Sequence, residues 1–172
     1  AARAAIKRAL SKKDEKELRA AVQAGERAGL LAQDLESAKK VLAELEKRSK
    51  KLQQLREATK KRSLEGLEAA IADAKQFFGK AADDEPDYQA ACKVLEEVMA
   101  EIEAKKQLDE AVASRDIDAL RAAISHAEGL GLPESVLEPA RNVLAEEEEK
   151  RLARDALRDA VASGVPSGLR EA

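Results

Sequence analysis

The chain has 172 residues, of which 44% are hydrophobic and 38% charged but only 2% aromatic, and its formal net charge is −3. A typical globular domain is about 25% charged, and three aromatic side chains without a tryptophan are too few for an ordinary mixed core. Most of the chain consists of helix formers such as Ala, Leu, Glu, Lys, Arg and Gln. The composition excludes a β-sandwich, a β-barrel and a disulfide scaffold, and predicts an all-α fold.

The first predicted elements are the end of a helix and a short helix over residues 14–28. Asp14 with Glu17 is typical of a capping pair at the start of this short helix. Gly29 stands where a left-handed residue commonly ends a helix. The apolar residues of both helices recur at helical spacing: Ile6, Ala9, Leu18 and Val22.

A long helix is predicted over residues 34–62. Neither Gly nor Pro interrupts it, Asp34 is placed to cap its start, and the basic residues 60–62 suit the negative end of the helix dipole. Apolar and small side chains step by three and four residues, a heptad-like pattern typical of coiled coils. They are Leu35, Ala38, Leu42, Leu45, Ser49 and Leu52.

Two more short helices are predicted, over residues 64–78 and 116–128. Each begins after a residue that commonly caps a helix N-terminus, Ser63 in the first case and Asp116 in the second. In each, apolar residues step by three and four, as an amphipathic helix requires. Glycines suited to a left-handed cap end them: Gly79 and Gly131.

Two more long helices are predicted, over about residues 86–114 and 133–162. Both begin at a proline, Pro86 or Pro133, and proline fits the first helical turn because its missing N–H has no partner there in any case. Pro139 would lie inside the last helix, where proline is unfavourable because it removes a backbone hydrogen bond. A start of this helix one turn later is therefore an alternative.

The alternation of long and short helices repeats along the chain. Ile6, Leu55, Leu108 and Leu157 occupy matching positions that lie 49, 53 and 49 residues apart. The four extra residues lie within the segment 77–87. We therefore expect one elongated array of helical hairpins over residues 1–172. Its parts are a partial repeat 1–33, repeats over about 34–85 and 86–132, and a partial repeat 133–172 in which Gly164-Val165-Pro166 marks the break before the next short helix.

Charge is unevenly distributed along the chain. Residues 1–62 carry 18 basic and 9 acidic side chains, a net charge of +9, whereas residues 63–172 carry 13 basic and 25 acidic side chains, a net charge of −12. Such a dipole matters for the choice of partner more than the total charge does. The acidic run 146–149 is interpreted as a solvated helix face, with ion pairs such as Glu146–Lys150.

Side chains that carry catalysis are scarce in this chain. Cys92 and His126 belong to no metal-ligand spacing, so we interpret Cys92 as a small packed residue and His126 as a capping or surface residue. The acidic segment 83–87 lacks the central glycine of a calcium loop and is interpreted as a solvated loop. No acid–base pair or phosphate loop is visible. The sequence therefore predicts no enzyme, no cofactor and no metal site.

A basic run within residues 47–62 is the strongest electrostatic feature. It could contact nucleic acid or an anionic membrane, but no aromatic residue is interleaved for base stacking, and no wide apolar face accompanies it. Docking on an acidic protein surface, including the acidic half of another copy, fits better; an exposed face without a partner stays open as well. The residues concerned are Lys47, Arg48, Lys50, Lys51, Lys60, Lys61 and Arg62.

The three aromatic residues, Phe77, Phe78 and Tyr88, bracket the one insertion that breaks the repeat spacing. Aromatic side chains are the usual anchors of protein interfaces. Two interpretations follow from this placement: the rings fill the corner between two helices, or they contact another protein.

The features that the sequence lacks also indicate the cellular compartment of the protein. One cysteine cannot form an internal disulfide, which favours a reducing compartment. No apolar run approaches the ~18 residues of a membrane span, and no signal peptide is visible. The chain begins with Ala-Ala-Arg, so we expect an excerpt or a processed protein of a soluble intracellular compartment, cytoplasmic or organellar, and not a secreted one.

The stretch DIDALRAAISHAEGLGL (116–132), followed by VLEPARNVL (136–144), resembles Ala-rich helical repeats in proteins of algae and other protists. The likeness extends over nearly the whole chain, and the period exceeds those of tetratricopeptide and ankyrin repeats. It implies a helical-repeat protein with no catalytic residue to transfer. We therefore expect a non-enzymatic scaffold that mediates protein–protein contacts, as a linker or as a peripheral subunit of a larger assembly.

Overall fold

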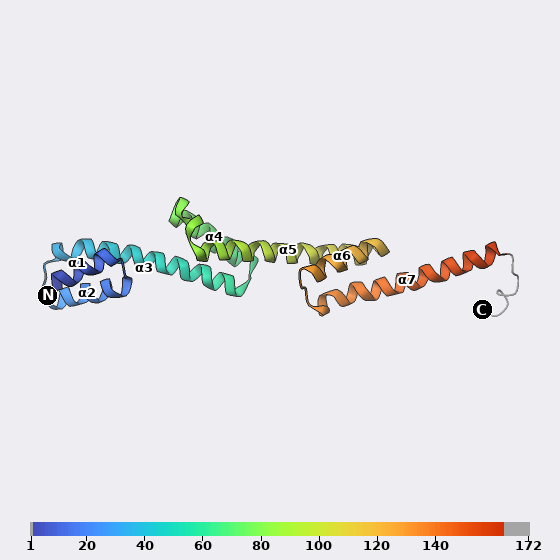
Figure 1. Cartoon of the computed structure of the whole chain (residues 1–172), viewed down its shortest axis with the longest axis horizontal. Coiled ribbons are helices and arrows are strands. Elements are labelled where there is room, and N and C mark those ends of the chain that lie inside the picture. The colour runs from blue at the N-terminus through green and yellow to red at the C-terminus, as the bar shows by residue number, and fades with distance from the viewer. Residues whose placement is uncertain (1, 164–172) are drawn as a thin grey trace. The chain divides into compact units, whose positions relative to one another are not determined.

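The computed structural model describes residues 2–163, except for the side chain of Asp34 (Figure 1). Over these residues the chain forms seven α-helices and one 3-10 helix, η1, so the all-α prediction is confirmed. Helices that are neighbours in sequence pack together: α1 on α2, α2 on α3, α3 on α4 and α6 on α7. The elements are α1 (Ala2–Lys12), α2 (Glu15–Arg27), α3 (Ala32–Lys61), α4 (Leu64–Phe78), η1 (Gly79–Asp84), α5 (Pro86–Ser114), α6 (Ile117–Gly129) and α7 (Glu134–Ala162).

The predicted helix bounds agree with the structure to within two residues. α3 begins at Ala32 with Leu31 as its N-cap and without a capping side chain, so the predicted start at Asp34 was wrong. Pro133, the predicted first residue of the last long helix, is instead the N-cap of α7, which begins one residue later at Glu134, and Pro139 is accommodated inside the helix. The predicted break at residues 164–166 lies outside the described residues.

Each short helix begins with the predicted side-chain cap. Asp14 accepts a hydrogen bond from the Glu17 N–H at 2.8 Å, and Asp116 accepts one from the Ala119 N–H at 2.8 Å. Ser63 caps α4 through the Gly66 N–H at 3.4 Å. These side chains satisfy backbone donors that have no partner within the helix. The glycines predicted to follow the short helices have positive φ angles, 71° at Gly29, 60° at Gly79 and 73° at Gly131.

The chain divides into two compact units, Ala1–Leu95 and Glu96–Ala172, and α5 contributes residues to both. The first unit buries a three-helix core built from α1, α2 and the beginning of α3. Its residues are Ile6, Ala9, Leu18, Ala21, Val22, Leu35 and Ala38. Because several of these side chains are alanines, the helices approach closely and the core is thin.

The far end of α3 pairs with α4 in the same unit. Leu55 and Leu67 expose none of their surface, and Ala74 exposes only 1%. The short helix η1 follows α4 directly, and its Ala82 is fully buried. The segment after α4 is therefore a structured corner.

The second unit has its own core between the end of α5, α6 and the beginning of α7. Leu120 of α6 is fully buried at its centre. The buried residues are Ala104, Leu108, Ala111, Leu120, Ala123, Ile124, Ala127, Leu132, Leu137 and Ala140.

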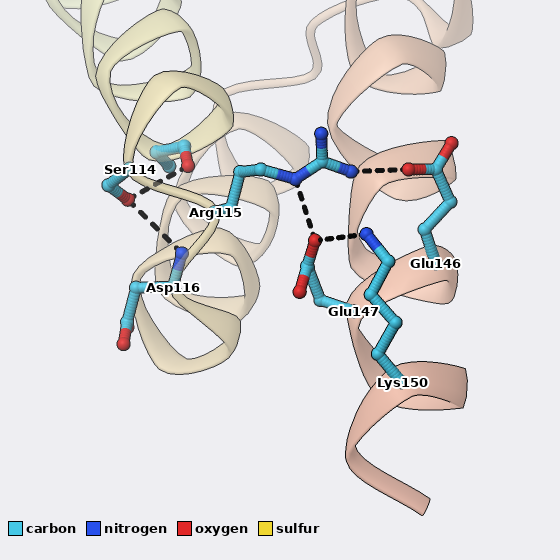
Figure 2. A network of polar contacts seen from close by, with 7 residues as sticks. Ser114, Arg115, Asp116, Glu146, Glu147 and Lys150 are labelled. Atoms are coloured by element: carbon cyan, nitrogen blue, oxygen red, sulfur yellow. Dashed lines mark hydrogen bonds and ion pairs between the residues drawn. The ribbon is translucent and has the colours of Figure 1, made fainter. Parts of the chain in front are cut away.

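Ion pairs tie the turn before α6 to α7, as Figure 2 shows. The Arg115 Nε donates to Glu147 Oε1 at 2.6 Å, and the same guanidinium also pairs with Glu146. The Lys150 Nζ donates to Glu147 at 2.9 Å. Lys150 and Arg115 lower the pKa of the Glu147 carboxyl below its ordinary value. The predicted Glu146–Lys150 pair was wrong, because Lys150 pairs with Glu147 and Arg115 takes Glu146.

No helix in the described part of the chain is both long and apolar enough to cross a membrane. The long helices α3, α5 and α7 have 30, 29 and 29 residues, so their length would suffice. These helices are not apolar enough, because charged residues recur along each of them.

Candidate contact site beside Phe77

The two phenylalanines at the end of α4 differ in exposure. Phe77 exposes 41% of its surface, whereas Phe78 is half-buried. Their rings meet edge to face with centroids 4.9 Å apart, an arrangement that aromatic pairs prefer. The Arg48 guanidinium of α3 lies 5.8 Å from the centroid of the Phe78 ring, within cation–π range.

These side chains line an open groove of about 550 Å³ in the first unit. α3 contributes apolar and charged residues to it, and the turn between α1 and α2 contributes Lys13. We call it the Phe77 groove, and its lining residues are Lys13, Val41, Glu44, Leu45, Arg48, Phe77 and Phe78. An apolar floor with charged residues at its rim is the usual composition of a protein contact site.

The structure thus brings together two features that the sequence treats separately. Arg48 comes from the basic run and Phe77 from the aromatic cluster. Sequence reasoning missed Lys13 and Glu44 as lining residues. It also assigned Leu45 to the helix-packing stripe, and an apolar residue at heptad spacing carries no signal that distinguishes a groove from a core.

Tyr88 is not among the residues that line the Phe77 groove. It is half-buried in the first turn of α5, and the Lys75 Nζ lies 5.5 Å from its ring centroid. Burial raises the pKa of the Tyr88 hydroxyl, and the neighbouring Cys92 raises it further. Lys75 also donates to Asp83 at 2.6 Å, and this hydrogen bond raises the pKa of the Lys75 amino group.

The acidic segment 83–87 lies against basic residues of α3 and α4. Glu85 pairs with Arg48, Asp87 pairs with Arg56 at 2.8 Å, and Asp83 pairs with Lys75. The Glu85 side chain exposes only 12% of its surface, so the interpretation of this segment as a solvated loop was wrong at that position. Opposite charges that lie far apart in sequence are paired here because the corner folds back onto α3.

The basic run is divided between paired and unpaired residues. Arg48 pairs with Glu85, and the Lys51 Nζ contacts Asp73 at 2.5 Å. Arg62 ends α3 with a left-handed φ of 50°. The remaining lysines are exposed, and none has a carboxylate within ion-pair distance among the described residues: Lys47, Lys50, Lys60 and Lys61.

The two residues with catalytic potential, Cys92 and His126, belong to different units of the chain. Cys92 is half-buried beside Tyr88, and His126 is exposed, with its Nδ1 2.9 Å from the Gln107 Oε1. Within residues 2–163 no group of three or more His, Cys, Asp or Glu side chains could hold a metal ion.

Models of known protein families, curated proteins and solved structures were compared with the chain, and none of them matches it.

Proposed function

We propose that this protein is a non-enzymatic helical-repeat scaffold, a linker or peripheral subunit that holds other proteins, and that the Phe77 groove is a contact site. The observation that carries the proposal is the exposed ring of Phe77 in an apolar groove beside Arg48. Aromatic residues and arginine dominate the binding energy of protein interfaces. This site also coincides with the one interruption of the repeat spacing.

Burial at matching positions supports the repeat. Leu18, Leu67 and Leu120 lie 49 and 53 residues apart, and each exposes none of its surface. A residue with left-handed backbone lies shortly before each short helix. These residues are also 49 and 53 positions apart: Lys13, Arg62 and Arg115. Matching backbone and matching burial are expected of units that share one packing solution.

Three shallow grooves, each along one pair of helices, support the repeat further. Their volumes are about 400, 370 and 540 Å³ for the α1–α2, α3–α4 and α5–α6 pairs. The same eight positions of the repeat line all three grooves. Adding 49 to each residue number of the first groove gives the lining residues of the second, and adding a further 53 gives those of the third. For the first groove they are Ala5, Arg8, Ala9, Lys12, Glu17, Ala20, Ala21 and Ala24.

The chemistry of the Phe77 groove indicates the kind of partner. Val41 and Leu45 offer an apolar floor, Arg48 and Lys13 contribute two positive charges to the lining, and Glu44 contributes one negative charge. A partner that inserts an apolar side chain next to a carboxylate would match both. Such a pair of contacts gives affinity through the apolar anchor and orientation through the charge.

We expect Phe77→Ala to weaken capture of a partner from the native cell extract by about tenfold or more. Ile102→Ala is the matched control, because Ile102 is exposed to a similar degree, 45%, but belongs to α5 and is not one of the residues that line the groove. Capture is quantified by mass spectrometry and folding by thermal melting. If Phe77→Ala lowers the melting temperature and leaves capture unchanged, Phe77 fills a corner and the proposal fails.

A second candidate function is binding to an anionic surface, either nucleic acid or membrane. The observation that favours it is the row of exposed lysines without ion pairs on α3, Lys47 and Lys50 among them. The double variant Lys47→Glu with Lys50→Glu is then expected to abolish salt-sensitive binding to DNA or to anionic vesicles. The control reverses Lys39 and Lys40, which pair with Glu26 and Glu36 on the same chain. Equal binding by both double variants would exclude this function.

A further inference from the structure

Ser63 differs chemically from the residues at the matching positions of the repeat. Asp14, Ser63 and Asp116 lie 49 and 53 positions apart, and each is the N-cap of a short helix. The two aspartates accept a backbone hydrogen bond at 2.8 Å, whereas the Ser63 Oγ accepts one from the Gly66 N–H at 3.4 Å. The usual range is about 2.7–3.2 Å. The first turn of α4 is therefore capped by a neutral and more distant oxygen.

Three basic residues, Lys60, Lys61 and Arg62, immediately precede Ser63. Their side chains and that of Ser63 are all exposed. The pattern of charges around an acceptor hydroxyl is a feature by which protein kinases select their substrates. A serine that follows three basic residues suits a kinase with an acidic substrate cleft, because opposite charges attract across the contact.

The backbone presents Ser63 to an enzyme. The residue lies between the end of α3 at Lys61 and the start of α4 at Leu64, with extended angles of φ −87° and ψ 127°. Its basic neighbours lie in the last turn of α3 and just after it, where helices commonly fray. Ser49 is also exposed and follows Lys47 and Arg48, but it lies in the middle of α3. Access to Ser49 would require that helix to unwind.

The first turn of α4 has room for an anion beside the Ser63 hydroxyl. A Cβ built at Gly66 would meet only the Oγ and Cβ of Ser63, at 3.5 and 3.6 Å. The matching position in α2 holds Glu17, whose carboxylate pairs with Lys12. Backbone N–H groups and the helix dipole favour a negative charge at a helix N-terminus. Glu65 opposes such a charge from the first turn, but the three preceding basic residues outnumber it.

We propose that Ser63 is a phosphorylation site for a serine kinase that selects basic residues before the acceptor, with ATP as the phosphoryl donor. The Ser63 Oγ forms a bond to the γ-phosphorus, and the bond from that phosphorus to the oxygen bridging to the β-phosphate breaks. ADP leaves, and the hydroxyl proton passes to the catalytic base of the kinase. This inference goes beyond the proposed scaffold function and does not depend on it.

The phosphate changes both the charge and the cap. It carries about −1.5 to −2 charges, so segment 60–63 falls from +3 to about +1. Its oxygens supply α4 with the negative acceptor that Asp14 and Asp116 supply to α2 and α6. Phosphorylation thus strengthens the beginning of α4 while it neutralises much of the basic end of α3.

The first experiment incubates the full chain with Mg-ATP and a purified serine kinase of this specificity, and locates the phosphate by mass spectrometry. We expect Ser63 to be modified at least about tenfold faster than Ser49, because only Ser49 requires unwinding of a helix centre. The double variant Lys60→Gln with Lys61→Gln should slow modification of Ser63 by about tenfold. Lys39→Gln with Lys40→Gln is the control on the same helix and should leave that rate unchanged.

The second experiment follows hydrogen exchange of the Gly66 amide by NMR, because this N–H is the one that Ser63 caps. Phosphorylation and Ser63→Asp are each expected to slow the exchange by about two- to fivefold, and Ser63→Ala is expected to accelerate it. Ser49→Asp is the control and should leave exchange at Gly66 unchanged.

The two experiments test different parts of the inference. An unmodified Ser63, or equal rates at Ser63 and Ser49, would overturn the assignment of the phosphorylation site. A phosphorylated chain whose Gly66 amide exchanges as fast as that of the unmodified chain would overturn the capping role of the phosphate.

Discussion

Leu120→Ala is expected to lower the free energy of unfolding of the second unit by about 2–5 kcal/mol. Leu120 is fully buried, and it lies in a cluster supplied by α5, α6 and α7. Many of its neighbours are alanines, which have no side-chain torsions with which to fill the space. The cavity therefore stays largely open, and the cost belongs in the upper part of that range.

The control for this substitution is Ile102→Ala, since Ile102 is 45% exposed on the same unit and surface changes are usually within about 0.5 kcal/mol. Urea titration followed by far-ultraviolet circular dichroism measures both. The total stability of a domain is about 5–15 kcal/mol, so the change at Leu120 would be a large fraction of it. Equal urea midpoints of unfolding for Leu120→Ala and Ile102→Ala would contradict the claim that Leu120 lies in a core formed by three helices.

Ala127→Leu is expected to destabilise the second unit by about 1–3 kcal/mol by overpacking. Ala127 is fully buried in α6, where small side chains set the distance between the helices. Leucine and alanine have similar helix propensities, so the loss reports packing and not helix formation. Either the new side chain leaves its preferred rotamer or the helices move apart.

Ala122→Leu is the matched control on the same helix, because Ala122 is exposed along the α5–α6 groove. Its unfolding midpoint should stay close to that of the unchanged chain. If Ala127→Leu were as stable as Ala122→Leu, close approach of the helices around Ala127 would be refuted. Thermal melts of both variants, at one protein concentration, make the comparison.

The helices and their caps could be predicted from sequence because the signals are local. Asp116 stands two residues beyond the end of α5, and its carboxylate does cap α6. Gly131 has the positive φ that its place after a short helix requires. The start of α3 was misplaced because Leu31 caps it without any side-chain hydrogen bond, which leaves no mark in the sequence.

The ion pairs and the Phe77 groove could not be predicted, because they join residues far apart in the chain. Arg48 meets Glu85 across 37 positions, and Arg115 meets Glu147 across 32. A charge pattern indicates pairs three or four residues apart on one helix, such as Glu146 with Lys150. It does not indicate which longer-range partner competes for the same carboxylate.

The role of Phe77 can be tested most directly by photo-cross-linking in cells. Phe77 is replaced by benzoylphenylalanine, which keeps an aromatic ring at this exposed position of the groove. The same replacement at Ile102 is the control. The proposed scaffold function predicts a light-dependent covalent adduct between position 77 and another protein, and none at position 102. No adduct at position 77, or equal adducts at both positions, would contradict it.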